Sequence, residues 1–287
     1  MSKAIFVTKA RGNQEPFSIS KLKRSMFDTG ASKEVIDQII SKLQPSVRQG
    51  ISTAQIHRLA FQHLKLANRI YAARYNLKKA IMRLGPDGFP FERYFAALLE
   101  YSGYKTYTNV IVNGKCITHE VDVIAEKADE NIHAIIEAKF HAHPGRKTGS
   151  KDALYTYGRF LDIKEGWDIK KQAGAKPQSG TLQSWLVTNT EMTDNAKRYC
   201  QCTGIKAIAW SYPNKEESLQ GMIHTHGLYP ITALLTLNQA QKLILLRQNI
   251  ILCKSLVEQG GSLKELGLNN NQIDQVLAEV NQLCDLG

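Results

Sequence analysis

A sharp change in charge divides this chain of 287 residues. Residues 1–86 hold 16 Lys and Arg against 4 Asp and Glu, a net charge of +12, whereas residues 87–287 hold 21 against 22, a net charge of −1. The change falls at a run of turn-forming residues, Gly85-Pro86-Asp87-Gly88-Phe89-Pro90, which favours a domain boundary. Because the length also exceeds that of one ordinary domain, we predict a basic domain over 1–86, a second domain over 87–230 and a C-terminal extension over 231–287.

Composition excludes several classes of protein. With 43% hydrophobic and 22% charged residues, the chain can form a core and is not disordered. No stretch reaches the roughly 20 uncharged apolar residues that a membrane helix needs, and the N-terminus, MSKAIFVTKARGN, lacks the apolar segment of a signal peptide. We therefore expect a cytoplasmic protein without a membrane partner. The five cysteines never occur as CxxC, which argues against a disulfide framework and a zinc ribbon.

The basic domain is predicted to be mostly helical. A short strand over 4–9 precedes helices expected over 19–29, 33–43, 53–65 and 67–84, where apolar residues recur at helical spacing. The positive charge of this domain suits phosphate, either on a nucleic acid or on a free nucleotide. The alternative is a solvated basic surface that binds no ligand.

The second domain is predicted to be α/β with a mixed sheet. After a helix over 91–102, two strands over 104–112 and 116–125 are joined by Asn113-Gly114, which indicates a two-residue hairpin turn. The elements expected next are a strand over 132–141, a helix over 152–163, a strand over 183–188, a helix over 193–203 and a strand over 206–210. The C-terminal extension is predicted to be helical.

This strand pattern brings three chemically capable side chains together. Asp122 lies on the second hairpin strand, and Glu137 and Lys139 lie two residues apart on the next strand. Because strand side chains alternate between faces, Glu137 and Lys139 share one face. Antiparallel pairing then places Asp122 beside Glu137. We therefore predict that two carboxylates and one ammonium group converge at one edge of the sheet.

Two adjacent carboxylates repel each other unless a cation neutralises them. A hard divalent ion such as Mg²⁺ would do so, with oxygen ligands from Asp122, Glu137 and the carbonyl of Ala138. Lys139 could then position a water or stabilise the charge of an attacked phosphodiester. Taken alone, this pattern of residues is a weak signal, and the alternative is a salt bridge on an exposed strand. Arg159, on the following helix, either faces the scissile phosphate or packs at the edge of the core.

Three blocks on these strands and the preceding helix form a known pattern. They are Phe91-Glu92-Arg93-Tyr94, Glu120-Val121-Asp122-Val123 and Ile136-Glu137-Ala138-Lys139. Through them, residues 88–235 resemble the PD-(D/E)xK nuclease superfamily, in particular its Mrr-like restriction endonuclease branch, with Val121 in place of the nominal proline. The resemblance implies a restriction-endonuclease-like α/β/α fold and DNA hydrolysis that depends on Mg²⁺ or Mn²⁺. It implies that Asp122 and Glu137 are metal ligands, that Lys139 holds or activates the nucleophilic water, and that Glu92 is the acidic residue of the preceding helix.

The basic domain carries a second known pattern. Its matching blocks are Phe6-Val7-Thr8-Lys9 with Arg11-Gly12, Glu15-Pro16-Phe17-Ser18 with Lys21-Leu22, Ile51-Ser52-Thr53 with Ile56-His57, and Tyr71 with Arg74-Tyr75. Residues 4–85 thus resemble the ATP-cone, the nucleotide-sensing domain of ribonucleotide reductases and of a repressor of their genes. The resemblance implies that ATP or dATP binds as an effector, with the candidate residues Lys9, Arg11, Lys21, Arg24, Tyr71 and Arg74. Because no GxxxxGKS loop occurs, we expect the nucleotide to be sensed and not hydrolysed.

These predictions combine into one main hypothesis, a Mg²⁺-dependent DNA endonuclease regulated by ATP or dATP. A role in defence against foreign DNA follows by family analogy. A second hypothesis is a catalytically silent, nucleotide-responsive DNA-binding regulator that reuses the nuclease fold. A third keeps the nuclease and makes the basic domain a DNA clamp that binds no nucleotide. Because a duplex cutter with one site per chain usually acts as a dimer or larger assembly, we also expect a homo-oligomer.

Overall fold

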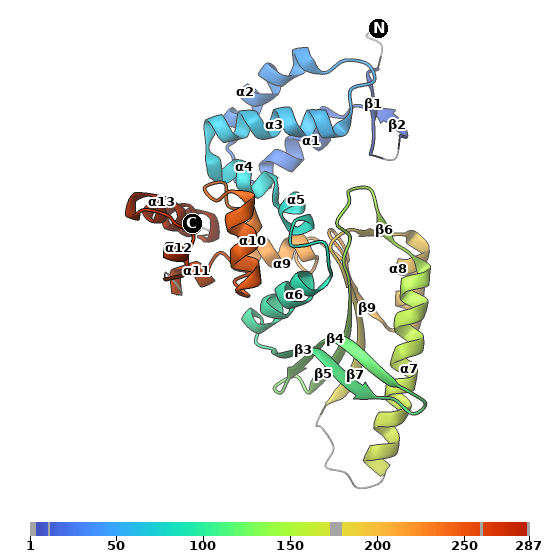
Figure 1. The fold of residues 1–287 in the computed structure, drawn as a ribbon. Helices are drawn as coiled ribbons and strands as arrows, with labels where there is room; N and C mark the ends of the chain where they lie inside the picture. Colours follow the sequence, from blue (N-terminus) through green and yellow to red (C-terminus); the bar gives the residue numbers. More distant parts are fainter. Residues whose placement is uncertain (1–3, 11, 173–179, 259–260, 286–287) are drawn as a thin grey trace. The chain divides into compact units, whose positions relative to one another are not determined.

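The computed structural model describes residues 4–10, 12–172, 180–258 and 261–285 (Figure 1). The chain folds into two compact units. The first unit contains residues 1–81, 231–245 and 253–287, and the second contains residues 82–230 and 246–252. Most of the C-terminal extension therefore packs with the N-terminal residues, although the second unit lies between them in the sequence.

The first unit is helical apart from a two-stranded antiparallel sheet. Its N-terminal elements are β1 (Phe6–Thr8), β2 (Gln14–Pro16), α1 (Ile19–Phe27), α2 (Lys33–Leu43), the 3₁₀ turn η1 (Gln44–Ser46), α3 (Thr53–Ala67), α4 (Arg69–Tyr75) and α5 (Leu77–Met82). Its C-terminal elements are the 3₁₀ turn η2 (Ile231–Ala233), α10 (Gln239–Arg247), α11 (Ser255–Glu258), α12 (Gly261–Glu265) and α13 (Asn270–Cys284). The last residue of α5 and the end of α10 belong to the second unit.

Serine caps fix the starts of three helices in the first unit, and the first of them is Ser18, whose Oγ accepts the Lys21 N–H at 3.2 Å at the start of α1. The Ser32 side chain caps α2, and Ser52 forms a reciprocal capping box with Gln55 at α3. Such caps satisfy backbone N–H groups that have no partner within the helix. The apolar faces of α1, α2 and α3 then pack together around β1, with Met26 and Leu64 fully buried.

The prediction of a single helix over 67–84 is wrong, because two asparagines interrupt this stretch. Asn68 ends α3 and caps α4, since its side chain accepts the Ile70 N–H at 2.7 Å. Asn76 separates α4 from α5. Asparagine side chains compete for backbone hydrogen bonds, which makes them more stable at helix ends than in helix interiors.

Hydrogen bonds tie the C-terminal extension into the first unit. Thr232 Oγ1 donates to the carbonyl of Ala80 at 2.8 Å. Arg74 Nη2 donates to the carbonyl of Asp285 at 2.9 Å and to two carbonyls in the last turn of α13 at 3.4 Å. A cation at this end of a helix also complements the helix dipole. Arg74 therefore joins α4 to the end of α13.

The second unit is built on a five-stranded mixed sheet in the order β3-β4-β5-β7-β9 (Figure 1). The strands β3, β4 and β5 are antiparallel neighbours, whereas β5, β7 and β9 are parallel neighbours. The elements of this unit are α6 (Phe89–Tyr101), β3 (Lys105–Asn113), β4 (Thr118–Lys127), β5 (Ile132–Lys139), β6 (Lys147–Thr148), α7 (Ser150–Gln172), β7 (Thr181–Thr188), β8 (Glu191–Met192), α8 (Asp194–Thr203), β9 (Lys206–Ile208) and α9 (Leu219–His226). The short strands β6 and β8 pair with each other.

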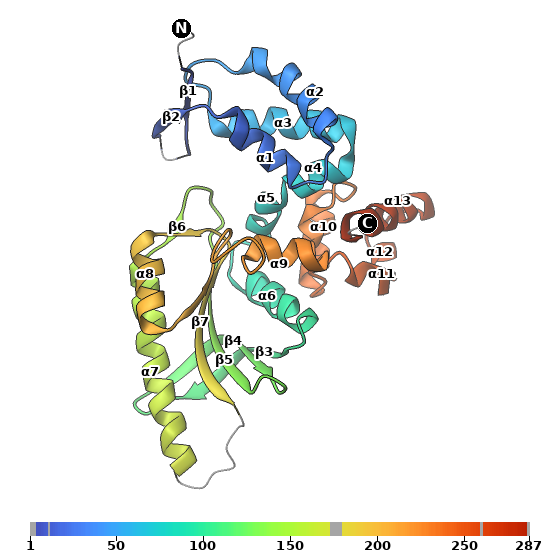
Figure 2. The same ribbon diagram turned by 180° about the vertical axis from the view of Figure 1, so that it is seen from behind.

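Helices cover both faces of the five-stranded sheet (Figure 2). The helices α7 and α8 share one face, where Ala153, Leu186 and Cys200 are buried in one cluster. The helix α6 lies on the opposite face, with Phe91 and Phe95 fully buried. The predicted α/β class, mixed sheet, mostly helical N-terminal region and helical C-terminal region are therefore confirmed. Among the described residues, no helix has both the length and the apolar character to cross a bilayer.

The hairpin between β3 and β4 differs from the predicted two-residue turn. Asn113 pairs with Thr118, so the connection consists of residues 114–117. Asp162 of α7 holds this longer loop, because its carboxylate accepts the N–H groups of Cys116 at 2.8 Å and Ile117 at 3.3 Å. A partner distant in the sequence thus replaces the turn that the local residues favour.

Two glycines let α7 approach this hairpin loop closely. A Cβ at Gly166 would lie 2.6 Å from the carbonyl carbon of Gly114. A Cβ at Gly114 would in turn overlap the Asp162 carboxylate. Because backbone cannot yield as a flexible side chain can, this contact sets how closely α7 lies against the hairpin.

We predict opposite effects of alanine at two glycines of α7. Gly166→Ala should lower the free energy of unfolding by about 1–3 kcal/mol, because the added methyl group meets the Gly114 backbone. Gly158→Ala is the matched control, since a Cβ there meets nothing within 4 Å, and it should raise stability by up to about 1 kcal/mol. Urea unfolding of both variants measures the difference. Equal effects of the two substitutions would contradict the close approach.

Candidate active site

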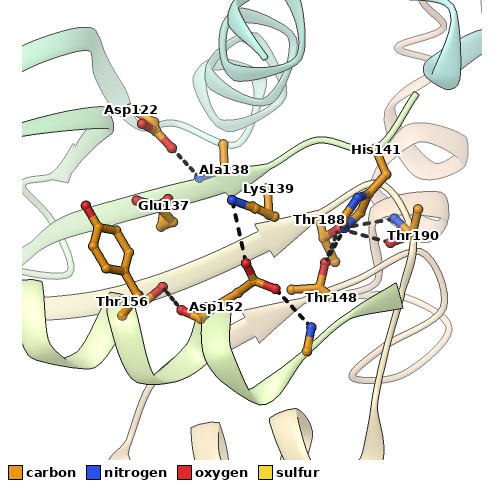
Figure 3. A network of polar contacts seen from close by, with 12 residues as sticks. Asp122, Glu137, Ala138, Lys139, His141, Thr148, Asp152, Thr156, Thr188 and Thr190 are labelled. Atoms are coloured by element: carbon orange, nitrogen blue, oxygen red, sulfur yellow. Dashed lines mark hydrogen bonds and ion pairs between the residues drawn. The ribbon is translucent and has the colours of Figure 1, made fainter. Parts of the chain in front are cut away.

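The residues predicted to carry chemistry lie at one end of the central strands. In the antiparallel pair of β4 and β5, Val123 lies opposite Ile136, so the next positions in register are Asp122 and Glu137. Figure 3 shows Asp122 close to the β5 backbone at Ala138, next to Glu137. The structure therefore brings both carboxylates to the same end of the sheet.

The side-chain alternation of β4 breaks at Asp122. Val121 and Ile124 are buried in one cluster against α7, although residues three apart on a regular strand point to opposite faces. On the neighbouring strand, the pairing skips Asn109, which has a positive φ of 54°. At this irregularity Asp122 is directed at the backbone of β5, where its Oδ2 accepts the Ala138 N–H at 2.7 Å.

The helix α7 supplies a charged partner for each functional side chain of β5. Arg159 Nη1 donates to Glu137 Oε2 at 2.6 Å, and both side chains are 13% exposed. Asp152 Oδ1 lies 3.6 Å from Lys139 Nζ, and the second Asp152 oxygen accepts the Gly149 N–H at 3.0 Å (Figure 3). Asp152 and Arg159 are two helical turns apart and therefore share one face of α7.

Glu92, in the first turn of α6, is a third carboxylate of the site. It is 8% exposed, and its Oε2 has no hydrogen-bond partner among the described residues. Burial, together with the negative charges of Asp122 and Glu137, raises the pKa of Glu92 to about 7. Burial and the charge of Asp122 also raise the pKa of Glu137 to about 7, although Arg159 opposes this shift. The three carboxylates thus form a desolvated group of like charges.

The donor chemistry of this group fits a hard divalent cation. The buried Glu92 Oε2 and the raised pKa values are features that added positive charge would relieve. Within an extended strand, the N–H and C=O of one residue point to the same edge. The Ala138 carbonyl therefore faces Asp122, as the Ala138 N–H does.

The described side chains do not by themselves form a complete set of metal ligands. Across the part of the chain that the structure describes, no group of three or more His, Cys, Asp or Glu side chains is arranged to hold a metal ion. The predicted set offers two carboxylates and one carbonyl, and Arg159 already binds one oxygen of Glu137. Metal binding at Asp122, Glu137 and Ala138 therefore stays a prediction.

A network that the sequence analysis missed fixes the chain just after β5. The Asn189 side chain accepts the His141 N–H at 2.8 Å and donates to the His141 carbonyl at 2.9 Å. His141 Nε2 lies 3.1 Å from Thr148 Oγ1, which donates to Thr188 Oγ1 at 2.8 Å (Figure 3). These bonds join the segment after Lys139 to the end of β7. The sequence feature that could have indicated this network is the polar run that directly follows the buried part of β7.

In the first unit, the structure brings together part of the predicted nucleotide-binding set. Lys9 Nζ lies 2.9 Å from Glu15 Oε2. The hydrogen bond from Lys9 and, more weakly, the charge of Lys21 lower the pKa of Glu15. Arg24 is exposed on α1, one turn after Lys21. Three cationic side chains thus lie on the β1–β2 hairpin and the adjacent helix.

The other predicted nucleotide-binding residues have different surroundings. Tyr71 packs against the apolar core of the first unit. Arg74 donates to the carbonyls at the end of α13 and, through Nη1, to the Thr29 carbonyl at 3.4 Å. Arg11 lies outside the described residues. The structure therefore gives Arg74 a structural role that the sequence did not predict.

Family models match both the N-terminal and the C-terminal region of the chain. Residues 5–81 match the model of the ATP cone domain, and residues 229–284 match the model of the C-terminal region of AF1548-like proteins. An uncharacterized protein of Archaeoglobus fulgidus is 39% identical over 189 residues, which cover 66% of this chain and 98% of the relative. The chain belongs to the AF1548-like family. The predicted ATP-cone is confirmed as the N-terminal domain of this family member.

Solved structures extend the comparison. The crystal structure of AF1548, described as a protein of unknown function, has a TM-score of 0.53 and 36% identity, and the match covers 69% of this chain and 98% of that chain. Can2 from Sulfobacillus thermosulfidooxidans, solved in complex with cyclic tetra-adenylate, has a TM-score of 0.30 and 13% identity over 75% of this chain and 64% of that chain. The similarity to Can2 is too low to support an inference about this chain. The Mrr-like assignment of this AF1548-like protein stays a prediction.

We predict that Glu92 makes the stability of this protein depend on pH. Its folded pKa of about 7 lies above its ordinary value of 4.5, so its contribution to stability is fully present below pH 4.5 and is lost as pH rises through 7. In EDTA, Glu92→Gln should therefore be more stable than wild type at pH 8, by about 1–3 kcal/mol, and equal to it near pH 5. Urea unfolding at both values measures the difference.

Glu216→Gln is the control for this experiment, because Glu216 is an exposed carboxylate of the second unit that lies outside the site. It should change stability little at either pH. If Glu92→Gln had the same effect at pH 5 and pH 8, the burial of an ionisable Glu92 would be wrong.

Proposed function

We propose that this AF1548-like protein is a nuclease that hydrolyses DNA with a divalent metal ion and is controlled by a nucleotide. The observation that carries the proposal is the convergence of Asp122, Glu137 and Lys139 at one end of the sheet (Figure 3), where the two carboxylates also raise the pKa of the buried Glu92. Buried carboxylates that repel one another destabilise a purely structural site, and such clusters are typical of functional sites. The resemblance of these residues to the PD-(D/E)xK pattern supports the same reaction.

In this proposal, Asp122, Glu137 and the Ala138 carbonyl hold Mg²⁺ or Mn²⁺. The bound ion would polarise the phosphodiester and lower the pKa of the attacking water. Lys139 orients that water or stabilises the negative charge on the attacked phosphate, and Asp152 holds the Lys139 ammonium group in place. Glu92, with a pKa of about 7, can exchange a proton near neutral pH and so fits a general acid or base.

The ATP-cone supports control by a nucleotide. Lys9, Lys21 and Arg24 lie on the β1–β2 hairpin and α1 of this domain, and their positive charges suit the phosphates of ATP or dATP. The charge of the N-terminal 86 residues, +12, favours the same class of ligand. Because one site cuts one strand, we also propose that two copies of the chain act together on duplex DNA.

We predict that cleavage depends on the acidic and basic residues of the site. Asp122→Ala and Lys139→Ala should each lower the rate of plasmid cleavage with Mg²⁺ or Mn²⁺ by on the order of 100-fold or more, since each removes a group that acts on the transition state. Asp194→Asn is the control, because the Asp194 side chain is 96% exposed on α8, and it should cleave like wild type. The assay is run without nucleotide, with ATP and with dATP.

Two results would contradict the enzyme. One is equal cleavage by wild type, Asp122→Ala and Lys139→Ala, which would indicate a contaminating nuclease. The other is no cleavage by wild type under any nucleotide and metal condition. DNA binding that persists in that second case would favour the catalytically silent regulator.

We predict that ATP and dATP bind the first unit with an affinity that depends on Lys21. Lys21→Ala should weaken binding about tenfold, the effect of losing ~1.4 kcal/mol from one charge-assisted contact. Lys33→Ala is the matched control, because it removes an exposed lysine from the neighbouring helix α2. Calorimetric titration of the full chain measures both. DNA binding without a saturable nucleotide site would instead favour a DNA clamp.

A further inference from the structure

Arg159 is the charged group most closely engaged with the proposed metal ligands. Its Nη1 donates to Glu137 Oε2 at 2.6 Å, and each side chain of this pair is 13% exposed. The ion pair is therefore largely removed from water. An arginine that binds a carboxylate this closely supplies positive charge at the place where the proposed reaction needs a metal ion.

A second set of contacts fixes the position of Arg159 on α7. Its Nη2 donates to the Tyr155 hydroxyl at 2.8 Å, and its guanidinium lies over the Tyr155 ring, 4.9 Å from the ring centroid. Tyr155 itself is 57% exposed. The guanidinium is thus held between a largely buried carboxylate and an exposed aromatic ring, and the exposed Tyr155 side chain can change its rotamer without a rearrangement of the core.

One atom of Arg159 is left without a partner in this arrangement. Its Nε is buried and has no hydrogen-bond partner among the described residues. A buried donor without a partner is destabilising, so the side chain does not have all its hydrogen bonds while it binds Glu137. The ion pair is strong enough to hold Arg159 in place, but this conformation leaves one of its donors unsatisfied.

We propose that Arg159 is a positioning residue that occupies the metal site through Glu137 and is displaced from it when the divalent ion binds. This inference rests on the proposed function, because it assumes that Glu137 is a metal ligand. An ion that binds Glu137 Oε2 would have to share this oxygen with the Arg159 guanidinium, and the positive charges of Arg159 and the ion repel each other. The ion must therefore compete with Arg159, and metal affinity is set in part by that competition.

The test is Mn²⁺ binding to the full-length protein at pH 8, followed by electron paramagnetic resonance of free Mn²⁺. Arg159→Gln should bind Mn²⁺ at least about fivefold more tightly than wild type, because the competing charge is gone. Arg198→Gln, which removes an exposed arginine from α8, is the charge-matched control and should bind like wild type. Arg159→Lys keeps the positive charge, and its Mn²⁺ affinity should lie between the affinities of wild type and Arg159→Gln.

A measurement on the wild-type protein covers the case in which Arg159→Gln does not fold. The Nε–H signal of Arg159, assigned by its absence from Arg159→Lys, should be visible in the nuclear magnetic resonance spectrum of the metal-free protein, because Nε is buried. Addition of Mg²⁺ should shift this signal and speed its exchange with water. In Asp122→Asn, the same addition should leave it unchanged.

The outcomes separate the two proposals. If Asp122→Asn weakens Mn²⁺ binding but Arg159→Gln leaves it unchanged or weaker, the metal site stands and the competition by Arg159 is overturned. If Asp122→Asn binds Mn²⁺ as wild type does, there is no metal at this site, and both proposals fail. Tighter binding by Arg159→Gln, with Asp122→Asn weaker and Arg198→Gln unchanged, supports both.

Discussion

The ion pair between Arg159 and Glu137 joins a 23-residue helix to the central strand where three carboxylates meet. Burial destabilises the charged form of each carboxylate, and the others add repulsion, which is why the pKa values of Glu92 and Glu137 rise to about 7. Arg159 offsets part of this repulsion at Glu137, and the Ala138 N–H does so at Asp122. Glu92 Oε2 receives no such compensation within the described residues. Opposed interactions of this kind are typical of sites that bind a ligand or perform a reaction.

The helix α7 organises the second unit around this site. Asp152 and Arg159 hold Lys139 and Glu137, while Asp162, further along the same helix, holds the loop between β3 and β4. Gly166 then brings the helix against that loop. Because interiors are close-packed, a shift of α7 cannot leave any of these contacts unchanged. The charges at the end of β5 are therefore set by the same helix that fixes the hairpin.

The first unit combines the ATP-cone with most of the region that matches the C-terminal region of AF1548-like proteins. Arg74 binds the end of α13 from α4. The buried Glu279 of α13 accepts the N–H groups of Leu235 at 2.7 Å and Thr236 at 2.8 Å. These are charge-assisted bonds with little exposure to water, so α13 cannot leave the unit without exposing or orphaning them. Most of the C-terminal extension is thus part of the unit that contains the ATP-cone.

Local sequence determined much of this protein. Serine caps and apolar spacing placed the starts of α2 and α3, and the strand period placed Glu137 and Lys139 on one face of β5, which is the face that meets α7. These features depend on residues within one or two turns or on neighbouring strands, whose geometry is the same in every protein. The asparagines that end the helices around α4 are also a local sequence signal. The helical spacing of apolar residues across them nevertheless predicted one continuous helix.

Tertiary structure decided the rest. The irregularity that directs Asp122 at Ala138, the four-residue loop held by Asp162, and the choice of Arg159 as partner for Glu137 all depend on segments that are distant in the sequence. Charge and burial at such positions are set by the segments that pack against them. The sequence of one segment does not reveal which distant segment that is. The sequence by itself therefore determined which residues could act, and the packing of α7 on the sheet decided which charges they meet.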